Sequence, residues 1–171
     1  MRQARPSDVA IIAEFNVRMA LETEQRRLDP ARVHAGVAAL LSDPAKGTYF
    51  LAEARSADSP AREKISPNAK AAGGDSPCSV AGQLLITYEW SDWRNGNFWW
   101  LQSVYVAEPF RGKSVFRTLF SHVQEIAKAS KDVCGLRLYM DSHNSSARQT
   151  YERLGMKQTS YEIFEIDFVL K

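Results

Sequence analysis

The sequence predicts an α/β fold that forms one domain over residues 1–171. Helix-like and strand-like segments alternate along the chain, and Gln102–Leu119 shows this in one block, where a strand passes through a turn into an amphipathic helix. The 171 residues are 44% apolar, which is enough to bury one sizeable core. We therefore expect a sheet with helices packed against it.

The first third of the chain is expected to hold a short strand at residues 2–5, two helices and a second strand. Ser7 or Asp8 can cap the first helix, which runs to about residue 21. The second helix is predicted over Pro30–Leu41, because proline is well tolerated at the first position of a helix. A strand over residues 48–53 follows.

Residues 56–79 differ from the rest of the chain in composition. They are rich in Ser, Ala and Pro, and Ile65 is their one large aliphatic residue. Such a segment cannot bury enough apolar surface to order itself. Because the part before it is too short to stand alone, we interpret it as a flexible loop insertion between two strands and not as a linker between domains.

The second half of the chain is predicted to begin with a β-hairpin. Its strands cover residues 80–90 and 98–107, and the turn at 92–97 contains Arg94-Asn95-Gly96, which suits a tight connection. Beyond it we expect a helix over residues 114–129 and strands over residues 135–140 and about 160–168.

The connection between the strand and the helix of the first block carries a phosphate-binding pattern. Arg111, Gly112 and Lys113 stand at the start of the helix, where unpaired N–H groups and the helix dipole favour an anion. Gly112 allows close approach of the backbone or a positive φ. Many such turns hold no ligand, so this pattern alone does not decide the function.

A second pattern lies at residues 144–156, which read NSSARQTYERLGM. Helical spacing places Asn144, Ala147, Tyr151 and Gly155 along roughly one face. Asn144 is suited to begin the helix, and Gly155 is suited to end it.

The order of these elements and the two patterns resemble the GNAT superfamily of acyl-CoA-dependent N-acyltransferases. The resemblance covers residues 80–167 well and the first 55 residues loosely. It implies a mixed, mostly antiparallel, twisted central sheet of six to seven strands, flanked by about four helices and splayed open at a cofactor cleft.

The resemblance also implies a binding site for acetyl-CoA, the acyl donor. The strand at 102–107 would pair with the pantetheine arm, with a backbone N–H of Val104 or Val106 near the thioester oxygen. Asn144 would contact the cofactor arm, and Tyr151 would protonate the leaving thiolate. The full set implied for the cofactor is Val104, Tyr105, Val106, Arg111, Gly112, Lys113, Ser114, Val115, Phe116, Arg117 and Asn144.

The chain departs from the family pattern in two places. Ser114 and Phe116 stand where the usual first motif has small residues, so the ring of Phe116 must turn into the core or shape the cofactor groove. Gln102 and Ser103 stand where many relatives carry a strand carboxylate that acts as the base.

The proton acceptor must therefore be another group or water. Two acidic clusters are candidates, LETEQ at the end of the first helix and TYEWSDW in the hairpin. Our first choice is Glu24 and our second is Glu89, although most glutamates are simply solvated surface charges. Four tryptophans crowd the same hairpin, and an aromatic wall beside carboxylates suits a cationic amine, unless these rings pack under the N-terminal helices.

These observations and the resemblance predict an enzyme that transfers an acetyl group directly to a primary amine of a small cationic molecule. No cysteine lies in either motif, so a covalent acyl-enzyme is not expected. A protein or peptide N-acetyltransferase and a non-catalytic CoA-binding sensor are the alternatives.

Composition excludes several other classes. The net charge of +2 gives no reason to expect nucleic acid as a partner, and no apolar run is long enough for a membrane. Neither Cys78 nor Cys134 lies in a metal-ligand pattern, and the three histidines are scattered, so we expect no metal. Two cysteines fit a reduced, cytoplasmic setting. The sequence is compatible with a homodimer and with a monomer.

Overall fold

The computed structural model describes residues 1–54 and 79–169, and the predicted insertion at 56–79 lies almost wholly outside them. The chain divides into two compact units, Met1–Leu138 and Tyr139–Lys171.

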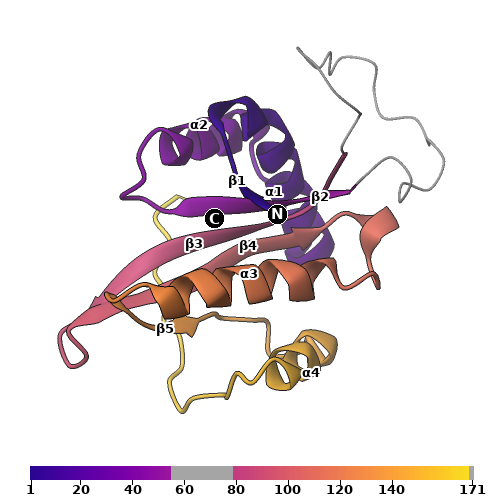
Figure 1. Ribbon diagram of the computed structural model, residues 1–171. Helices are drawn as coiled ribbons and strands as arrows, with labels where there is room; N and C mark the ends of the chain where they lie inside the picture. The colour runs from indigo at the N-terminus through magenta and orange to yellow at the C-terminus, as the bar shows by residue number, and fades with distance from the viewer. Residues whose placement is uncertain (55–78, 170–171) are drawn as a thin grey trace. The chain divides into compact units, whose positions relative to one another are not determined.

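The first unit is built on a five-stranded sheet (Figure 1). The strands follow the order β1-β2-β3-β4-β5; neighbours are antiparallel except β4 and β5, which run parallel. The expected mixed, mostly antiparallel sheet is therefore confirmed, with five strands among the described residues where six or seven were expected. The strands are β1 (Arg2–Gln3), β2 (Thr48–Ala54), β3 (Ser79–Ser91), β4 (Gly96–Val106) and β5 (Val133–Arg137).

Three helices cover the two faces of this sheet. Figure 1 shows α1 (Val9–Glu24) and α2 (Pro30–Leu41) on one face and α3 (Val115–Ala129) on the other. Strand alternation explains the division. Tyr49 and Leu51 join a buried cluster with residues of α1 and α2, whereas the ring of Phe50 lies 5.6 Å from the ring of His122 on α3.

The start of α1 differs from the predicted cap. Asp8 precedes the helix, but its carboxylate does not bond the N–H groups of α1. It accepts hydrogen bonds from the Arg2 guanidinium at 2.7 and 2.9 Å and from the Arg5 N–H at 2.7 Å. The bond from Arg2 is the main cause that lowers the pKa of Asp8. This residue thus ties the first strand to the helix.

The second unit holds α4 (Ser145–Arg153), and its ends agree with the prediction. The Asn144 side chain accepts a hydrogen bond from the Ala147 N–H at 2.9 Å, and Gly155, with φ of 85°, follows the end of the helix.

The predicted strand at 160–168 is wrong. These residues form no strand, and apolar side chains among them, such as Phe164 and Phe168, are exposed. Alternation along a segment indicates which side chains would share a face, but a strand also needs a neighbouring strand as hydrogen-bond partner, and the structure gives this segment none.

Candidate functional site

Only part of the β4 edge that faces β5 is paired with that strand. Parallel pairing joins Asn97–Trp100 to Val133–Arg137 and stops there. Residues 101–106 of β4 therefore have no β5 partner, and their backbone groups on this edge can pair with another extended chain. Here β5 itself ends, since Arg137 is both its last residue and the last to pair with β4.

A β-bulge lies in the middle of this unpaired stretch. The register between β3 and β4 shifts between Gln83 and Leu85, and Ser103 has a φ of 46°. A bulge bends its strand and changes the direction of the next side chains and backbone groups. The bulge thus sets the orientation of the Val104 N–H.

A chain of buried polar side chains lies beneath the bulge. Gln83 is fully buried, and its amide N–H donates to the Asn16 side chain at 2.7 Å. Asn16 donates in turn to the Tyr49 hydroxyl at 2.9 Å. Burial raises the pKa of Tyr49, while hydrogen bonds with Asn16 and Ser103 act in the opposite direction. This network connects α1 to the bulge, and no local pattern in the sequence indicates it, because its members lie on four separate elements.

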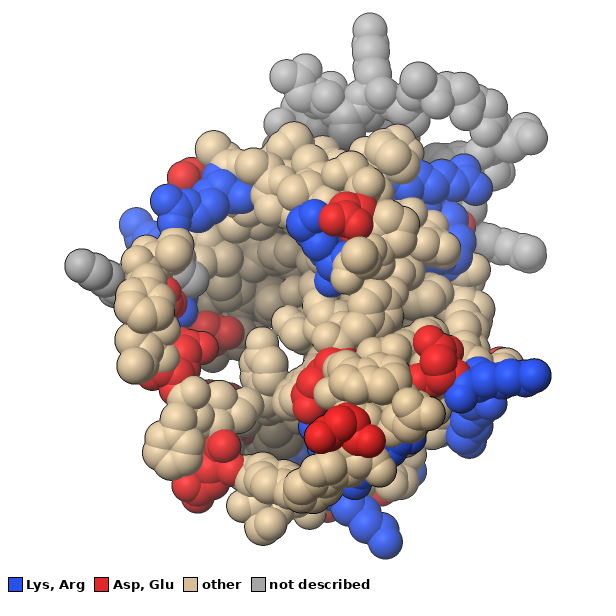
Figure 2. Space-filling model, turned by 90° about the vertical axis from the view of Figure 1, so that its left-hand side faces the viewer, with Lys and Arg blue, Asp and Glu red and all other residues tan. Residues whose placement is uncertain are grey.

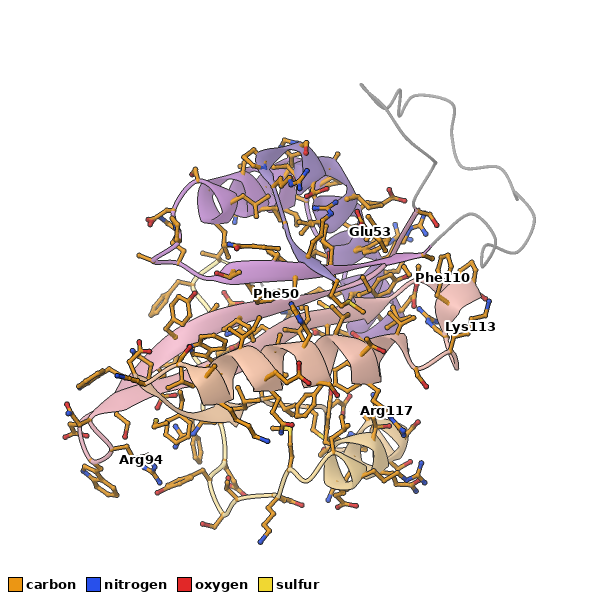
Figure 3. All side chains as sticks on the ribbon, viewed as in Figure 1. Phe50, Glu53, Arg94, Phe110, Lys113 and Arg117 are labelled. Carbon is orange, nitrogen blue, oxygen red and sulfur yellow. The ribbon has the colours of Figure 1, made fainter. Side chains whose placement is uncertain are left out.

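The basic turn after β4 has the backbone of an anion site. A short 3₁₀ helix (Glu108–Phe110) leads into it, and both Gly112, with φ of 73°, and Ser114, with φ of 61°, are left-handed. Such conformations turn successive N–H groups toward one side, and the first N–H groups of α3 have no partner within the helix. The Ser114 hydroxyl makes no capping bond. Figure 3 shows Lys113 beside Phe110, whose ring centroid lies 5.7 Å from the Lys113 Nζ.

The two departures from the family pattern are accommodated in this turn. Ser114 takes the left-handed conformation that a glycine would adopt more easily. Phe116 turns its ring toward Phe120, one helical turn further along α3, with the ring centroids 6.1 Å apart. The larger side chain therefore packs against Phe120, which is buried. Its expected part in shaping the cofactor groove stays a prediction.

Arg111 is engaged by groups that the sequence did not connect to it. Its Nη2 donates to the Glu22 carboxylate at the end of α1, and its Nε donates to the Val106 carbonyl at 3.0 Å. Its guanidinium also lies over the Tyr105 ring, 5.5 Å from the centroid. The Tyr105 hydroxyl donates to the other oxygen of Glu22 at 2.8 Å. We call Glu22, Tyr105 and Arg111 the α1–turn cluster.

Opposing influences act on the pKa values of this cluster. Desolvation acts to raise the pKa of Glu22, but the hydrogen bonds from Arg111 and Tyr105 hold it below its ordinary value. Burial raises the pKa of Tyr105, and its bond to Glu22 adds to this. At neutral pH Glu22 is therefore a carboxylate and Tyr105 a neutral donor.

The two candidate bases lie in different surroundings. Glu24 is the exposed last residue of α1. Glu89, on β3, accepts hydrogen bonds from Trp100 Nε1 and from Arg137 Nη1, the latter at 2.7 Å. The Arg137 guanidinium lies 3.6 Å from the centroid of the Phe98 ring. We call Glu89, Trp100 and Arg137, with Phe98, the hairpin cluster.

The tryptophans divide into two pairs. Trp90 and Trp93 are exposed, at 58% and 84%, whereas Trp99 and Trp100 are half-buried and point to opposite faces of β4. Trp100 contacts a carboxylate, as an amine site would require, but Arg137 already provides the cation there.

The second unit contributes the two remaining candidate residues. Asn144 uses its side-chain oxygen to cap α4, and the half-buried Tyr151 lies on the same helix. Burial raises the pKa of the Tyr151 hydroxyl, so it is protonated at neutral pH and able to donate a proton.

Charged side chains of both signs are interspersed over the face shown in Figure 2.

In the part of the chain that the structure describes, no three His, Cys, Asp or Glu side chains gather as a metal site requires. Within the same residues, every helix is too short or too polar to cross a bilayer.

Comparisons with known proteins agree on one family. Residues 34–156 match the model of the acetyltransferase (GNAT) family. A possible acetyltransferase from Clostridium difficile 630 is 37% identical, with a TM-score of 0.79 over 98% of this chain and 96% of that one. A predicted acetyltransferase from Clostridium acetobutylicum, solved with acetyl-CoA, has a TM-score of 0.67 at 13% identity, over 97% of this chain and 94% of that one. None of the curated proteins matches the chain.

Proposed function

The chain belongs to the GNAT family and is an acetyl-CoA-dependent acetyltransferase, and on that premise we propose that it transfers the acetyl group directly to a primary amine of a small cationic molecule. The observation that carries this proposal is the position of Glu22. Its carboxylate lies at the end of α1 and bonds Tyr105, a residue of the strand proposed to hold the cofactor.

The cofactor is proposed to lie along the unpaired edge of β4 and to end at the basic turn. The edge offers backbone N–H and C=O groups to the pantetheine arm, including the N–H groups of Val104 and Val106. The N–H groups at the start of α3, with Gly112 and Ser114 left-handed before them, form a concavity that suits a diphosphate. Arg111, Lys113 and Arg117 add positive charge. The residues present therefore fit acetyl-CoA, which supplies the activated acetyl thioester.

The acceptor is proposed to approach from the α1 side of β4. Glu22 and Glu24 place two carboxylates at the end of that helix, and carboxylates attract an ammonium group. Glu24 is our proposed proton acceptor because its side chain is exposed. Glu89 remains second, since Arg137 and Trp100 already occupy its oxygens.

Tyr151 is proposed as the proton donor to the leaving thiolate, and Asn144 as a contact of the cofactor arm. The Tyr151 hydroxyl is protonated at neutral pH, as a general acid must be before transfer, while the rise of its pKa by burial makes it a weaker acid. Direct transfer is favoured because neither motif contains a cysteine that could carry the acetyl group.

The test is a thermal-shift titration with acetyl-CoA, followed by a free-thiol assay against four acceptors: spermidine, tyramine, a peptide with a free N-terminus and an N-terminally blocked lysine peptide. Binding should raise the melting temperature by mass action. Thiol release should be fastest with the small amines. Faster release with either peptide would favour a protein acetyltransferase, and a thermal shift without release from any acceptor would favour a sensor.

A further inference from the structure

The α1–turn cluster gives Arg111 two competing partners. In the structure its guanidinium is paired with Glu22, while the proposed function places the same side chain in the cradle of the cofactor's diphosphate. Both partners are anions, and each attracts the guanidinium of Arg111 toward itself. The Arg111 guanidinium can therefore pair with one of these anions at a time more easily than with both at once.

The pair with Glu22 is suited to exchange. The side chains of Arg111 and Glu22 are 47% and 40% exposed, so water screens their attraction. Ion pairs of this kind contribute little net stability. A diphosphate carries more charge than one carboxylate and would compete well for the guanidinium.

Glu22 would not lose its position when Arg111 leaves. Its other oxygen accepts the hydrogen bond from Tyr105 at 2.8 Å. The Tyr105 side chain is held in place, because it is only 5% exposed and its ring centroid lies 5.0 Å from that of Phe15 on α1. The carboxylate would stay fixed beside β4 but would lack its cation.

We propose that Arg111 is shared between Glu22 in the free protein and the diphosphate of acetyl-CoA in the complex, so that cofactor binding frees Glu22 to hold the ammonium group of the acceptor. This inference rests on the proposed function, since it uses the same cofactor site. It links the two sites through one side chain.

The test is the variant Glu22→Gln, measured as the full chain by calorimetric titration with acetyl-CoA. The amide keeps an oxygen for Tyr105 but no longer competes as an anion for Arg111. The variant should bind acetyl-CoA about two- to fivefold more tightly, the range expected for an exposed ion pair. A purely structural role for Glu22 would predict unchanged or weaker binding.

Two controls separate exchange from a general change in charge. Glu14→Gln removes another exposed, ion-paired carboxylate from the same helix, where Glu14 pairs with Arg18. It should leave the affinity for acetyl-CoA nearly unchanged. S-acetylpantetheine lacks the diphosphate, so Glu22→Gln should not tighten its binding.

The acceptor role of Glu22 has its own measurement. With the fastest amine of the panel, Glu22→Gln should raise KM about tenfold or more with a smaller change in kcat. The proposal is overturned if the variant fails to bind acetyl-CoA more tightly, if Glu14→Gln tightens binding equally, or if KM for the amine is unchanged. Failure of the wild-type chain to bind acetyl-CoA would instead remove the proposed function.

Discussion

The α1–turn cluster and the hairpin cluster are built from the same parts. In each, a glutamate accepts one hydrogen bond from an aromatic residue of β4, Tyr105 or Trp100, and one from an arginine that also lies over an aromatic ring. They differ in how firmly the arginine is held. The Arg137 side chain is 30% exposed and lies 3.6 Å from its ring centroid, whereas Arg111 is 47% exposed and lies 5.5 Å away.

This difference indicates different roles for two similar groups. Arg137 joins β5 to Glu89 of β3 at the point where β4 and β5 are still paired, so it holds the sheet together. Arg111 stands at the basic turn, beyond the part of β4 that pairs with β5, and its exposed ion pair can be opened at small cost. A carboxylate beside an arginine is therefore a fixed structural contact in one cluster and an exchangeable one in the other.

The largest expected effect concerns which tyrosine supplies the proton. The Tyr105 hydroxyl is committed to Glu22, so we expect Tyr151 to be the acid. Tyr151→Phe should lower kcat by about 10²- to 10⁴-fold, the usual contribution of general acid catalysis, with little change in acetyl-CoA affinity. Because the pKa of Tyr151 is raised above its ordinary value of 10, the acid is protonated below that pH, and its ionisation should reduce kcat only above it.

Steady-state kinetics from pH 7 to 10.5 checks this prediction, with Tyr105→Phe as the matched control. An equal loss of kcat in the control would place the acid in the α1–turn cluster, and the different roles assigned to Tyr151 and Tyr105 would be wrong.

The next largest effect is on the affinity for acetyl-CoA, which should depend on Arg111 and not on Arg137. Arg111→Ala combined with Lys113→Ala should weaken acetyl-CoA about 10- to 100-fold, because one or two charge-assisted contacts to the diphosphate are lost. Titration of the double variant with S-acetylpantetheine should show a much smaller loss. Arg137→Ala should bind acetyl-CoA nearly as the wild type does. Equal losses for the two ligands would show that the basic turn does not hold the diphosphate.

A smaller effect is expected on the free energy of unfolding, and for this quantity Arg137 should matter more than Arg111. Arg137→Ala should lower the free energy of unfolding by about 1 kcal/mol, since it removes a partly exposed ion pair and a close cation–π contact. Arg111→Ala should cost less, because its pair is more exposed. Urea unfolding of both variants measures the difference, and a larger loss for Arg111→Ala would assign the structural role to the α1–turn cluster.

The sequence predicted what depends on neighbouring residues. The bounds of α2, the left-handed Gly112, the Asn144 cap and the helix end at Gly155 all follow from local chemistry. The pairing of Glu22 with Arg111 joins residues 89 positions apart, and nothing in the spacing of either motif indicates it.

The same limit explains the other differences. The residue at which β5 and its pairing with β4 end depends on the packing of the whole sheet, and the segment 160–168 has the alternation of a strand without a strand partner. The acidic end of α1 is recognisable from the sequence, but local spacing does not indicate that Glu22 contacts β4 through Tyr105. The choice of Glu24 as the base stays a prediction.

The smallest expected effect concerns the left-handed residue that begins α3. Ser114 adopts a φ of 61°, which costs a residue with a Cβ about 1–2 kcal/mol. Ser114→Gly removes this cost but gives the unfolded chain more freedom, which opposes it by about 0.4–1 kcal/mol. The variant should therefore be more stable by up to about 1.6 kcal/mol in urea unfolding. It should bind acetyl-CoA at least as well, because the Ser114 hydroxyl makes no capping bond and the N–H groups remain. Weaker binding in a stable Ser114→Gly variant would show that the hydroxyl itself contacts the phosphate, and the basic turn would then bind its anion through side chains more than through its backbone.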